Sequence, residues 1–281
     1  MNKARLKKVL VTGAAGSIGS EIVRQCSETD KVFCLDNNEV GVYDLIEELR
    51  LLGRDVIGYV GDIRNSETVQ DVFSSFQPDI VYHAAAYKCV TPMELRPTEA
   101  IDVNILGTNN ILKAAKFYST KRLVYISTDK AVSMNSVMGA TKKFGEILTK
   151  NAGYTVVRFG NVMGSRGSVI PFWKNQIKRG QPITITDKRC ERFLMSIEDA
   201  VRLVREAGDR GGPGQIWILN MGSPFNVYDL AKKIIKESGN DPKTYPIKII
   251  GLRPGETLTE SLMTAEEKER CYTDGNFYVI K

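Results

Sequence analysis

An α/β fold built on a doubly wound parallel sheet is predicted by three observations on this 281-residue sequence. Short apolar runs alternate with helical segments, which is the pattern of repeated β-α-β units. The first run, residues 8–12, passes through a glycine-rich turn into a helix. The second run, residues 31–36, ends in an acidic residue, and a further run is followed by hydroxyl, carboxylate and amine side chains. Ligands bind at such strand ends in open parallel sheets.

The other elements follow from the same periodicities. Each expected strand is a short apolar run bounded by turn residues, and each expected helix has apolar residues three or four positions apart. Ser66 and Ser196 are suitable N-cap residues for two of the helices. Strands are expected at 8–12, 31–36, 56–60, 80–83, 123–126, 155–159, 183–186, 215–219 and 247–250. Helices are expected after the turn at 13–19 through residue 26, and at 40–52, 66–76, 97–118, 138–150, 171–179, 196–208 and 227–238.

The composition is that of a globular protein, with 42% hydrophobic and 26% charged residues. No apolar run reaches the ~20 residues that span a bilayer, and no leader pattern begins the sequence. We therefore predict a cytoplasmic protein without membrane insertion. The net charge of +6 suits an anionic ligand but is too diffuse to indicate nucleic acid.

Cysteine and histidine usage argues against metal and disulfide chemistry. The five cysteines are odd in number and widely spaced, so we expect buried or half-buried thiols in a reducing compartment. The single histidine, His83, makes a histidine-rich metal site or a Ser-His-Asp triad a poor fit. We expect no metal, and we interpret His83 as a structural residue near a strand end.

The turn at residues 13–19 has the pattern Gly-x-x-Gly-x-x-Gly between a strand and a helix. Gly13, Gly16 and Gly19 permit a tight turn and a close approach of the backbone to a pyrophosphate. Ser17 and Ile18 are expected cofactor contacts in the same turn, and the free N–H groups and dipole of the helix that follows favour an anion. This context predicts a dinucleotide site of the Rossmann type.

Asp36 lies 17 residues after Gly19, close to the spacing of a carboxylate that binds the adenine ribose. Such a carboxylate repels a 2′-phosphate, and no arginine or lysine follows before Arg50, so NAD is favoured over NADP. The alternative is a turn or capping aspartate. Further expected cofactor contacts are Asp62 and Ile63 near the adenine, the small residues Ala84, Ala85 and Ala86, and the mid-helix Asn104. Asp62 also fits a turn, and the alanines also fit a packed crossover.

The segment Ser127-Thr128-Asp129-Lys130 follows the apolar run 123–126. Lys142 lies one helical turn after Met138, so both project from one helix face. Two amines, a hydroxyl and a carboxylate are thus expected around one point. The alternative is a polar strand end followed by a capped helix.

Together these motifs resemble the extended short-chain dehydrogenase/reductase superfamily. Within it the chain is similar to the UDP-N-acetylglucosamine 4,6-dehydratases of the capsular polysaccharide and flagellin-sugar group. The resemblance implies a UDP-sugar substrate, NAD as cofactor and a homo-oligomer (dimer or higher). Relatives with this core often carry membrane helices before it, so we expect a short form or an excised domain. The segments that carry the resemblance are 12–19, 82–88, 127–132, 139–142, 158–171 and 253–256.

One departure from the superfamily pattern is Met138. Short-chain dehydrogenases carry Tyr-x-x-x-Lys, with a tyrosinate as base, and here a methionine precedes Lys142. A thioether cannot accept the proton of a sugar hydroxyl. A branch of the 4,6-dehydratases has methionine at this position and is active, so the resemblance favours another base over an inactive protein.

The resemblance also implies a mechanism. NAD removes hydride from C4 of the sugar, loss of the C5 proton expels O6 as water, and the hydride returns to C6. Thr128 is expected to bind O4, and Lys142 to hold the nicotinamide ribose. Asp129 and Lys130 are expected as acid and base, or in the reverse roles, and Lys130 can be a base only if its pKa falls.

The later residues are expected to bind the UDP-sugar. This divides the chain into an NAD-binding Rossmann domain, 1–165, and a smaller α/β UDP-sugar-binding region, 166–281, interleaved with it. Arg189 is expected at the surface instead. The rival functions are a UDP-sugar 4-epimerase of the same fold and a catalytically inactive NAD-binding protein. The expected substrate contacts are Lys88 in a loop at 87–92, Asn161, Arg192, Arg253 and Glu256.

Overall fold

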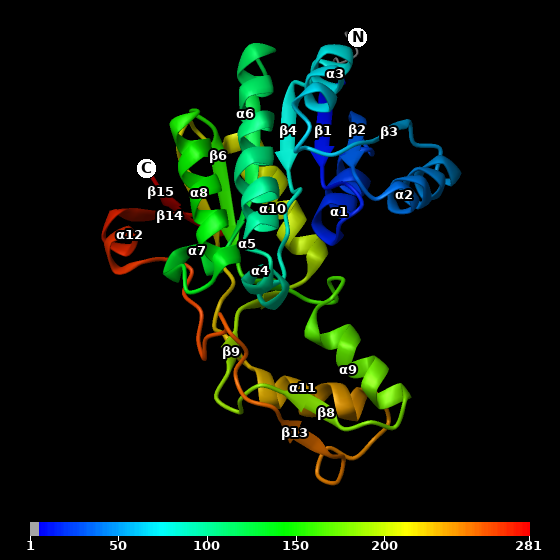
Figure 1. The fold of residues 1–281 in the computed structure, drawn as a ribbon, viewed down its shortest axis with the longest axis vertical. Coiled ribbons are helices and arrows are strands. Elements are labelled where there is room, and N and C mark those ends of the chain that lie inside the picture. The colour runs from blue at the N-terminus through cyan, green and yellow to red at the C-terminus, as the bar shows by residue number, and fades with distance from the viewer. Residues whose placement is uncertain (1–5) are drawn as a thin grey trace.

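A nine-stranded sheet forms the centre of the computed structural model, which describes residues 6–281 (Figure 1). The strand order is β14-β15-β11-β6-β5-β4-β1-β2-β3. The seven strands from β11 to β3 in this order are parallel, and β15 and β14 add an antiparallel edge. The predicted α/β class is confirmed. The strands are β1 Lys8–Thr12, β2 Lys31–Asp36, β3 Val56–Val60, β4 Ile80–His83, β5 Arg122–Thr128, β6 Thr155–Phe159, β11 Ile216–Leu219, β14 Cys271–Asp274 and β15 Phe277–Ile280.

Helices cover both faces of this sheet, as the crossover connections of a parallel sheet require (Figure 1). Helix α1 packs against α10 on one face, and α3, α6 and α8 pack in a row on the other. Their apolar faces and the strands form one continuous core. The helices are α1 Ser17–Cys26, α2 Glu39–Leu51, α3 Ser66–Phe76, α6 Thr108–Phe117, α8 Val137–Asn151 and α10 Ile197–Arg210.

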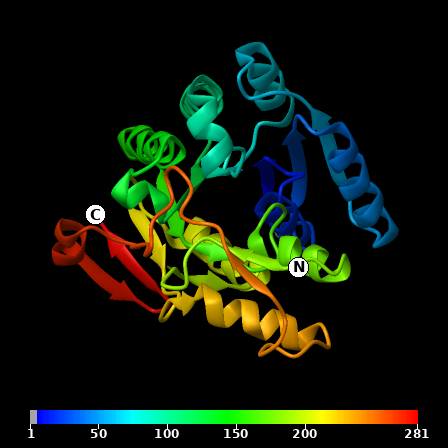
Figure 2. The same cartoon turned by 60° about the horizontal axis from the view of Figure 1, so that its bottom comes forward.

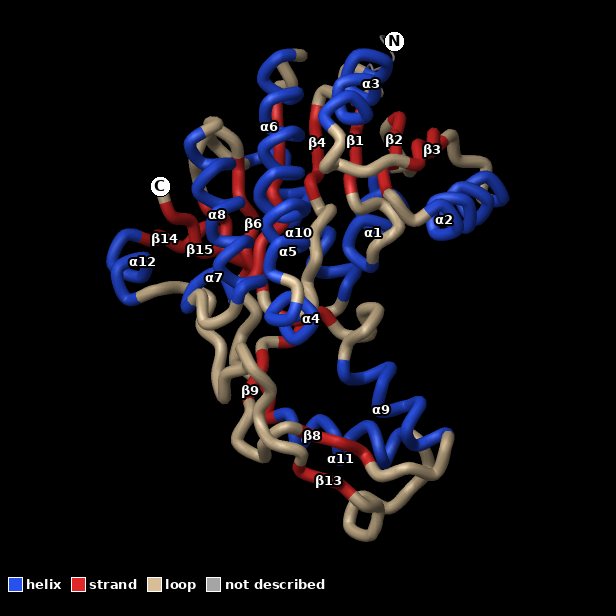
Figure 3. The backbone as a smooth tube through the Cα atoms, viewed as in Figure 1, coloured by secondary structure: helices blue, strands red, loops and turns tan. Residues whose placement is uncertain are grey.

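A smaller lobe lies beyond the carboxyl ends of the strands (Figures 1 and 2). It is built from α9 Val169–Lys178, α11 Val227–Glu237 and the parallel pair β8 Ile183–Ile185 and β13 Ile247–Ile249. This lobe has its own apolar core, in which Trp173 is fully buried. The chain after residue 166 therefore contributes to both lobes, because α10 and β11 return to the large sheet (Figure 3).

Several short elements were not predicted, among them two helices and a hairpin. The residues expected as a loop at 87–92 include the start of the short helix α4, Val90–Leu95. Helix α12, Ala265–Arg270, begins with a capping box, and the β14–β15 hairpin turns through Gly275-Asn276. Both are recognisable local signals. Within residues 6–281, none of the helices has the length and apolar character to cross a bilayer.

Candidate active site

The glycine turn is packed too closely for side chains. Gly13 has φ +68°, and a Cβ there would lie 2.5 Å from the backbone nitrogen of Ala85. A Cβ on Gly19 would lie 2.0 Å from the Gly13 carbonyl oxygen. Helix α1 begins beside this turn with Gly16 as N-cap and no acidic residue in its first turn. The turn thus offers bare backbone and a positive helix end, which fit a pyrophosphate.

Gly19→Ala should therefore weaken NAD binding by roughly tenfold or more, because the turn must move to admit the methyl group. The NAD dissociation constant can be measured by calorimetric titration. Gly212→Ala is the matched control, since its Cβ would meet only the flexible end of Gln215. An affinity for NAD within twofold of the unmodified protein would contradict this role for the turn.

The carboxylate of Asp36 is anchored beside the glycine turn. Its two oxygens accept hydrogen bonds from the backbone nitrogens of Ala15 and Asn38, each at 2.9 Å. Each carboxylate oxygen can accept a second hydrogen bond, so the group can still receive ribose hydroxyls. Asp62 instead forms a two-pronged ion pair with Arg64, whose hydrogen bonds lower the pKa of that carboxyl.

The small residues after β4 lie against the glycine turn. The nitrogen of Ala84 donates to the Thr12 carbonyl at 3.0 Å, and Ala86 follows at the same strand end. Ile63 is buried on the neighbouring side, against Gly107. The contact of these residues with the cofactor stays a prediction.

His83 is fully buried at the end of β4, as predicted. Its ring nitrogens bond to the hydroxyls of Thr12 at 2.6 Å and Thr108 at 2.9 Å. Burial, assisted by the Lys142 charge, lowers its pKa to about 3. The ring is therefore neutral near pH 7 and has a structural role.

Asn104 lies in a π-helical stretch, Asp102–Gly107, that interrupts the predicted helix 97–118. Its side chain exchanges hydrogen bonds with both backbone groups of Tyr87 and donates to the hydroxyl of Thr141 at 3.0 Å. Such stretches often occur at functional sites. Here the stretch ties the loop after β4 to α8, the helix that carries Met138 and Lys142.

Thr128, Asp129 and Lys130 gather at the carboxyl end of β5. The Thr128 hydroxyl donates to Asp129 Oδ1 at 2.9 Å, and Lys130 Nζ donates to the same oxygen at 3.0 Å. Asp129 is fully buried, and Oδ2 has no hydrogen-bond partner among residues 6–281. A buried, unpartnered carboxylate oxygen is costly unless a ligand uses it. The ammonium also donates to Asn161 Oδ1 at 3.2 Å and lies 3.5 Å from Glu260 Oε1.

The charge state of Lys130 differs from the expectation. Burial lowers its pKa, but Asp129 and Glu260 outweigh burial and leave the pKa raised above its ordinary value. Lys142 does not supply the lowering that a lysine base requires. The resting pair is therefore an ammonium and a carboxylate, with Lys130 as donor and Asp129 as acceptor.

Lys142 is buried on α8, where Nζ donates to the Ile126 carbonyl at 2.6 Å and lies 4.0 Å from the centre of the Tyr125 ring. Burial lowers its pKa to about 7, against the opposing charge of Glu146. Met138, one turn earlier, is buried in an apolar cluster with Met93. The Met138 thioether itself therefore offers no proton acceptor at the position where the superfamily carries a phenol.

Lys142→Met should stabilise the protein at pH 6, because the folded chain then no longer buries an ammonium. The gain should shrink as the pH rises from 7 towards 10, where the folded lysine is neutral and only the unfolded lysine still binds a proton. Thermal melting across this range measures the effect. An equal or lower melting temperature at pH 6 would contradict the lowered pKa of Lys142.

A buried network of ion pairs contacts the carboxyl end of β5 through Ser127. Arg158 on β6 makes paired hydrogen bonds to Glu146 and Glu267, with contacts as short as 2.7 Å to each. Ser127 donates to the same Glu146 at 2.7 Å. The network thus connects β6, α8 and α12 beside Ser127, the residue before Thr128. Sequence analysis did not single out Glu146 or Arg158, although a charge within an apolar strand implies a buried partner.

The expected substrate residues are placed differently. Asn161 lies at the cluster as an acceptor for Lys130. The guanidinium of Arg192 donates to backbone carbonyls, including Leu258 at 3.0 Å and Thr257 at 2.8 Å, so it holds another segment of the chain. Arg192 is thus engaged within the protein.

The remaining expected contacts lie near the surface. Arg253 is exposed on a turn, where its backbone nitrogen donates to Glu256 Oε2 at 3.1 Å. Lys88 donates to the Ser165 hydroxyl at 3.4 Å. Arg189 is exposed and pairs with Asp187 at 2.8 Å, as expected for a surface arginine.

The cysteines follow the prediction with one exception. Cys26, Cys34 and Cys190 are buried and Cys271 is half-buried, but Cys89 is exposed. Burial raises the pKa of the Cys26 and Cys34 thiols to about 12. The exception arises because Cys89 lies in the loop before α4, which is outside the sheet.

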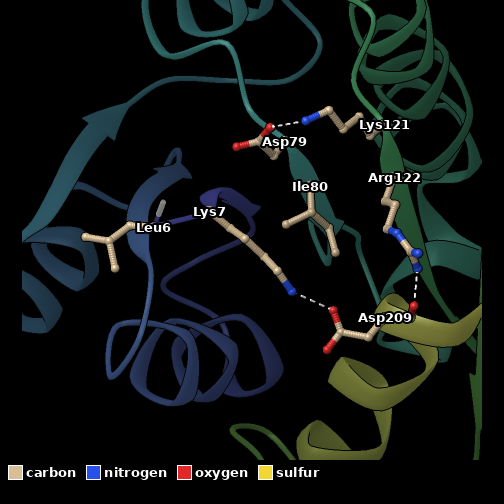
Figure 4. Close-up of a pocket in the computed structure, with 7 residues that line it drawn as sticks. All are labelled: Leu6, Lys7, Asp79, Ile80, Lys121, Arg122 and Asp209. Atoms are coloured by element: carbon tan, nitrogen blue, oxygen red, sulfur yellow. Dashed lines mark hydrogen bonds and ion pairs between the residues drawn. The ribbon is translucent and has the colours of Figure 1, made fainter. Parts of the chain in front are cut away.

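A cavity of about 430 Å³ lies at the opposite end of the sheet, where β4 and β5 begin (Figure 4). Its charges are paired within the protein. Lys7 bonds to Asp209 at 2.8 Å, and Lys121 bonds to Asp79 at 2.9 Å. Thr128 ends β5, so this cavity lies far along the strands from the cluster of reactive groups.

The fold, the glycine turn and the lysine on α8 are those of the extended short-chain dehydrogenase/reductase class. More specifically, the chain belongs to the polysaccharide biosynthesis protein family, whose profile matches residues 9–281. It is 44% identical over 273 residues to the capsular polysaccharide biosynthesis protein CapD of Staphylococcus aureus, covering 93% of this chain and 46% of CapD. The chain thus spans about half the length of that relative.

This chain covers most of the length of other relatives. The chain is 35% identical to the UDP-glucose 4-epimerase of Rickettsia bellii (strain OSU 85-389), covering 98% of this chain and 82% of the epimerase. The crystal structure of Pen from Bacillus thuringiensis superposes with a TM-score of 0.92 at 37% identity, covering 98% of this chain and 87% of Pen. The UDP-glucose 4-epimerase of Thermus thermophilus, solved with NAD, shares the fold at a TM-score of 0.78 and 24% identity, covering 92% of this chain and 90% of that one.

Proposed function

We propose that this protein catalyses the NAD-dependent 4,6-dehydration of UDP-N-acetylglucosamine. The product is a UDP-4-keto-6-deoxy-N-acetylhexosamine, used in bacterial-type surface polysaccharide or glycan synthesis. The observation that supports the proposal most strongly is the pair formed by the buried Asp129 and the half-buried Lys130. The pair supplies an acceptor and a donor of protons side by side. Elimination of water needs both groups at once, one at C5 and one at O6. Membership of the polysaccharide biosynthesis family supports the pathway.

The proposal gives each group of the cluster a role. Asp129 Oδ2, which lacks a partner among the described residues, takes the C5 proton. Lys130, held as an ammonium, gives its proton to O6 as the C6–O6 bond breaks. Thr128 orients O4 beside them, and Asn161 directs the ammonium. This is the reverse of the first-expected assignment, in which Lys130 was the base.

The cofactor site fits NAD. When bound, NAD would accept a hydride from C4 and later return it to C6. The glycine turn would hold its pyrophosphate, and Asp36 its adenine ribose, because both present the needed donors and acceptors. Lys142 lies under the same strand end and would hold the second ribose.

A UDP-sugar 4-epimerase is the second candidate, favoured by the similarity to the Rickettsia epimerase. Epimerisation needs no proton donor at O6, so it gives the Asp129–Lys130 pair no chemical role. The two reactions also differ in product mass, because an epimerase conserves mass and a dehydratase removes one water.

The test is incubation of the purified protein with NAD and UDP-N-acetylglucosamine, followed by mass spectrometry and by NMR in deuterated water. We expect loss of one water and deuterium at C5, whose configuration the NMR spectrum reports. An isomer of unchanged mass would establish the epimerase instead. Cofactor binding without any product from a panel of UDP-sugars would establish an inactive protein.

A further inference from the structure

The ammonium of Lys130 is surrounded by acceptors from three separate segments. Asp129 Oδ1 and Asn161 Oδ1 accept hydrogen bonds at 3.0 and 3.2 Å, and Glu260 Oε1 lies 3.5 Å away. A lysine has three N–H donors, so this set matches the whole ammonium. The Lys130 side chain is 21% exposed and that of Glu260 only 6%. Glu260 is thus a second carboxylate placed at the reacting centre, and sequence analysis did not single it out.

Glu260 is fixed by Arg192. The guanidinium donates to the carbonyls of Thr257 and Leu258, in the segment just before Glu260. Its Nε also lies 3.8 Å from Glu260 Oε1. The arginine therefore holds both the backbone and the carboxylate of this segment, which explains why its donors are not directed at solvent.

We propose that Glu260 is a positioning residue that keeps Lys130 in its protonated, donor form. The inference rests on the proposed dehydration. Three charged side chains face this ammonium: Asp129 and Glu260 favour the proton on nitrogen, and Arg192 opposes it. Asn161 is neutral and only orients it.

The elimination explains why a second carboxylate is needed. The C5–H bond breaks and its proton goes to Asp129, while a Lys130 proton goes to O6 and water leaves as the C5–C6 double bond forms. Asp129 later returns its proton to C5 as the hydride returns to C6. The proton released earlier from O4 passes to solvent, and the partly exposed Lys130 takes one proton back from solvent, so the count closes. During these steps Asp129 is neutral, so Glu260 is the charge that still draws a proton back to Lys130.

Glu260→Gln tests this with nearly unchanged shape. In the variant, the alkaline limb of the kcat profile should move to lower pH by about one unit, with KM for UDP-N-acetylglucosamine within about twofold. A second readout is independent of turnover: competitive labelling of lysine amines, analysed by mass spectrometry, gives the pKa of Lys130 in both proteins. Glu266→Gln is the control, since that side chain is 76% exposed and pairs only with Arg270 at 2.8 Å among the described residues. Thermal melting verifies that each variant is folded.

A lowered Lys130 pKa by labelling, with the alkaline limb shifted in parallel, supports the proposal. A folded Glu260→Gln protein with the Lys130 pKa and the alkaline limb both unchanged overturns it. If the unmodified protein forms no dehydrated product, the proposed dehydration fails. The labelling result then still decides whether Glu260 holds the proton on Lys130.

Discussion

Lys130→Ala should reduce the turnover of UDP-N-acetylglucosamine by about 10²- to 10⁴-fold, the usual contribution of a positioned acid or base. In the proposed dehydration the lost amine is the donor to O6, and its removal also leaves Asp129 and Glu260 without the ammonium between them. Substrate affinity should change only a few-fold, because the amine acts on the reacting end of the sugar. Steady-state kinetics and calorimetric binding of UDP-N-acetylglucosamine measure the two effects.

Lys233→Ala is the control for that experiment. Its side chain is 72% exposed on α11, far along the sequence from the cluster, and it should leave turnover unchanged. Turnover by Lys130→Ala within threefold of the unmodified protein would remove Lys130 from the chemistry. A large loss of substrate binding would instead make it a binding residue.

Arg158→Met should destabilise the protein by about 3–5 kcal/mol, the usual cost of removing one partner from a buried ion pair. Glu146 and Glu267 would remain buried, and among the described residues Lys143 would be their remaining salt-bridge partner, at 3.3 and 3.4 Å. Urea unfolding at pH 7 measures the change. Arg210→Met is the control, because Arg210 pairs with Glu206 and Asp274 at the surface and should matter much less. Equal stabilities for the two variants would contradict the importance of the buried network.

The same network predicts an acid limit to stability. Although burial opposes it, Arg158 lowers the pKa of Glu267 to about 2. The folded pKa is below the unfolded value of about 4.3, so this stabilisation is present above pH 4 to 5 and is lost as the pH falls towards 2. In Arg158→Met that part of the pH dependence should flatten, as a urea series from pH 3 to 7 can show.

The large sheet was predictable because its signals are local. Each strand from β1 to β6 is a short apolar run, buried along most of its length except in the edge strand β3, and such runs can be recognised within five or six residues. The glycine turn and Asp36 were found for the same reason, since strand, turn and helix are consecutive. The cluster at Thr128–Lys130 was found because its members are neighbours in sequence.

The residues that complete the site were missed because their partners are distant. Arg158 and Glu267 are 109 positions apart, and only the fold brings them together. Glu260 lies in an irregular segment without apolar periodicity, so nothing local marks it. Arg192 looked like a phosphate ligand from its residue type, yet the structure uses its donors on nearby carbonyls. Local patterns report elements, whereas these contacts depend on topology.

The antiparallel strand β15 attaches the C-terminal end of the chain to the large sheet. Strand β15 pairs with β11, and its residues Phe277 and Val279 are completely buried. The C-terminal hairpin therefore anchors the chain to the large sheet after the segment that carries Glu260. Glu260 and Glu267 both lie in the segment between β13 and this hairpin. Removal of the hairpin should therefore loosen the segment that carries Glu260 and Glu267, whereas Asp129 and Lys130 lie on other elements of the fold.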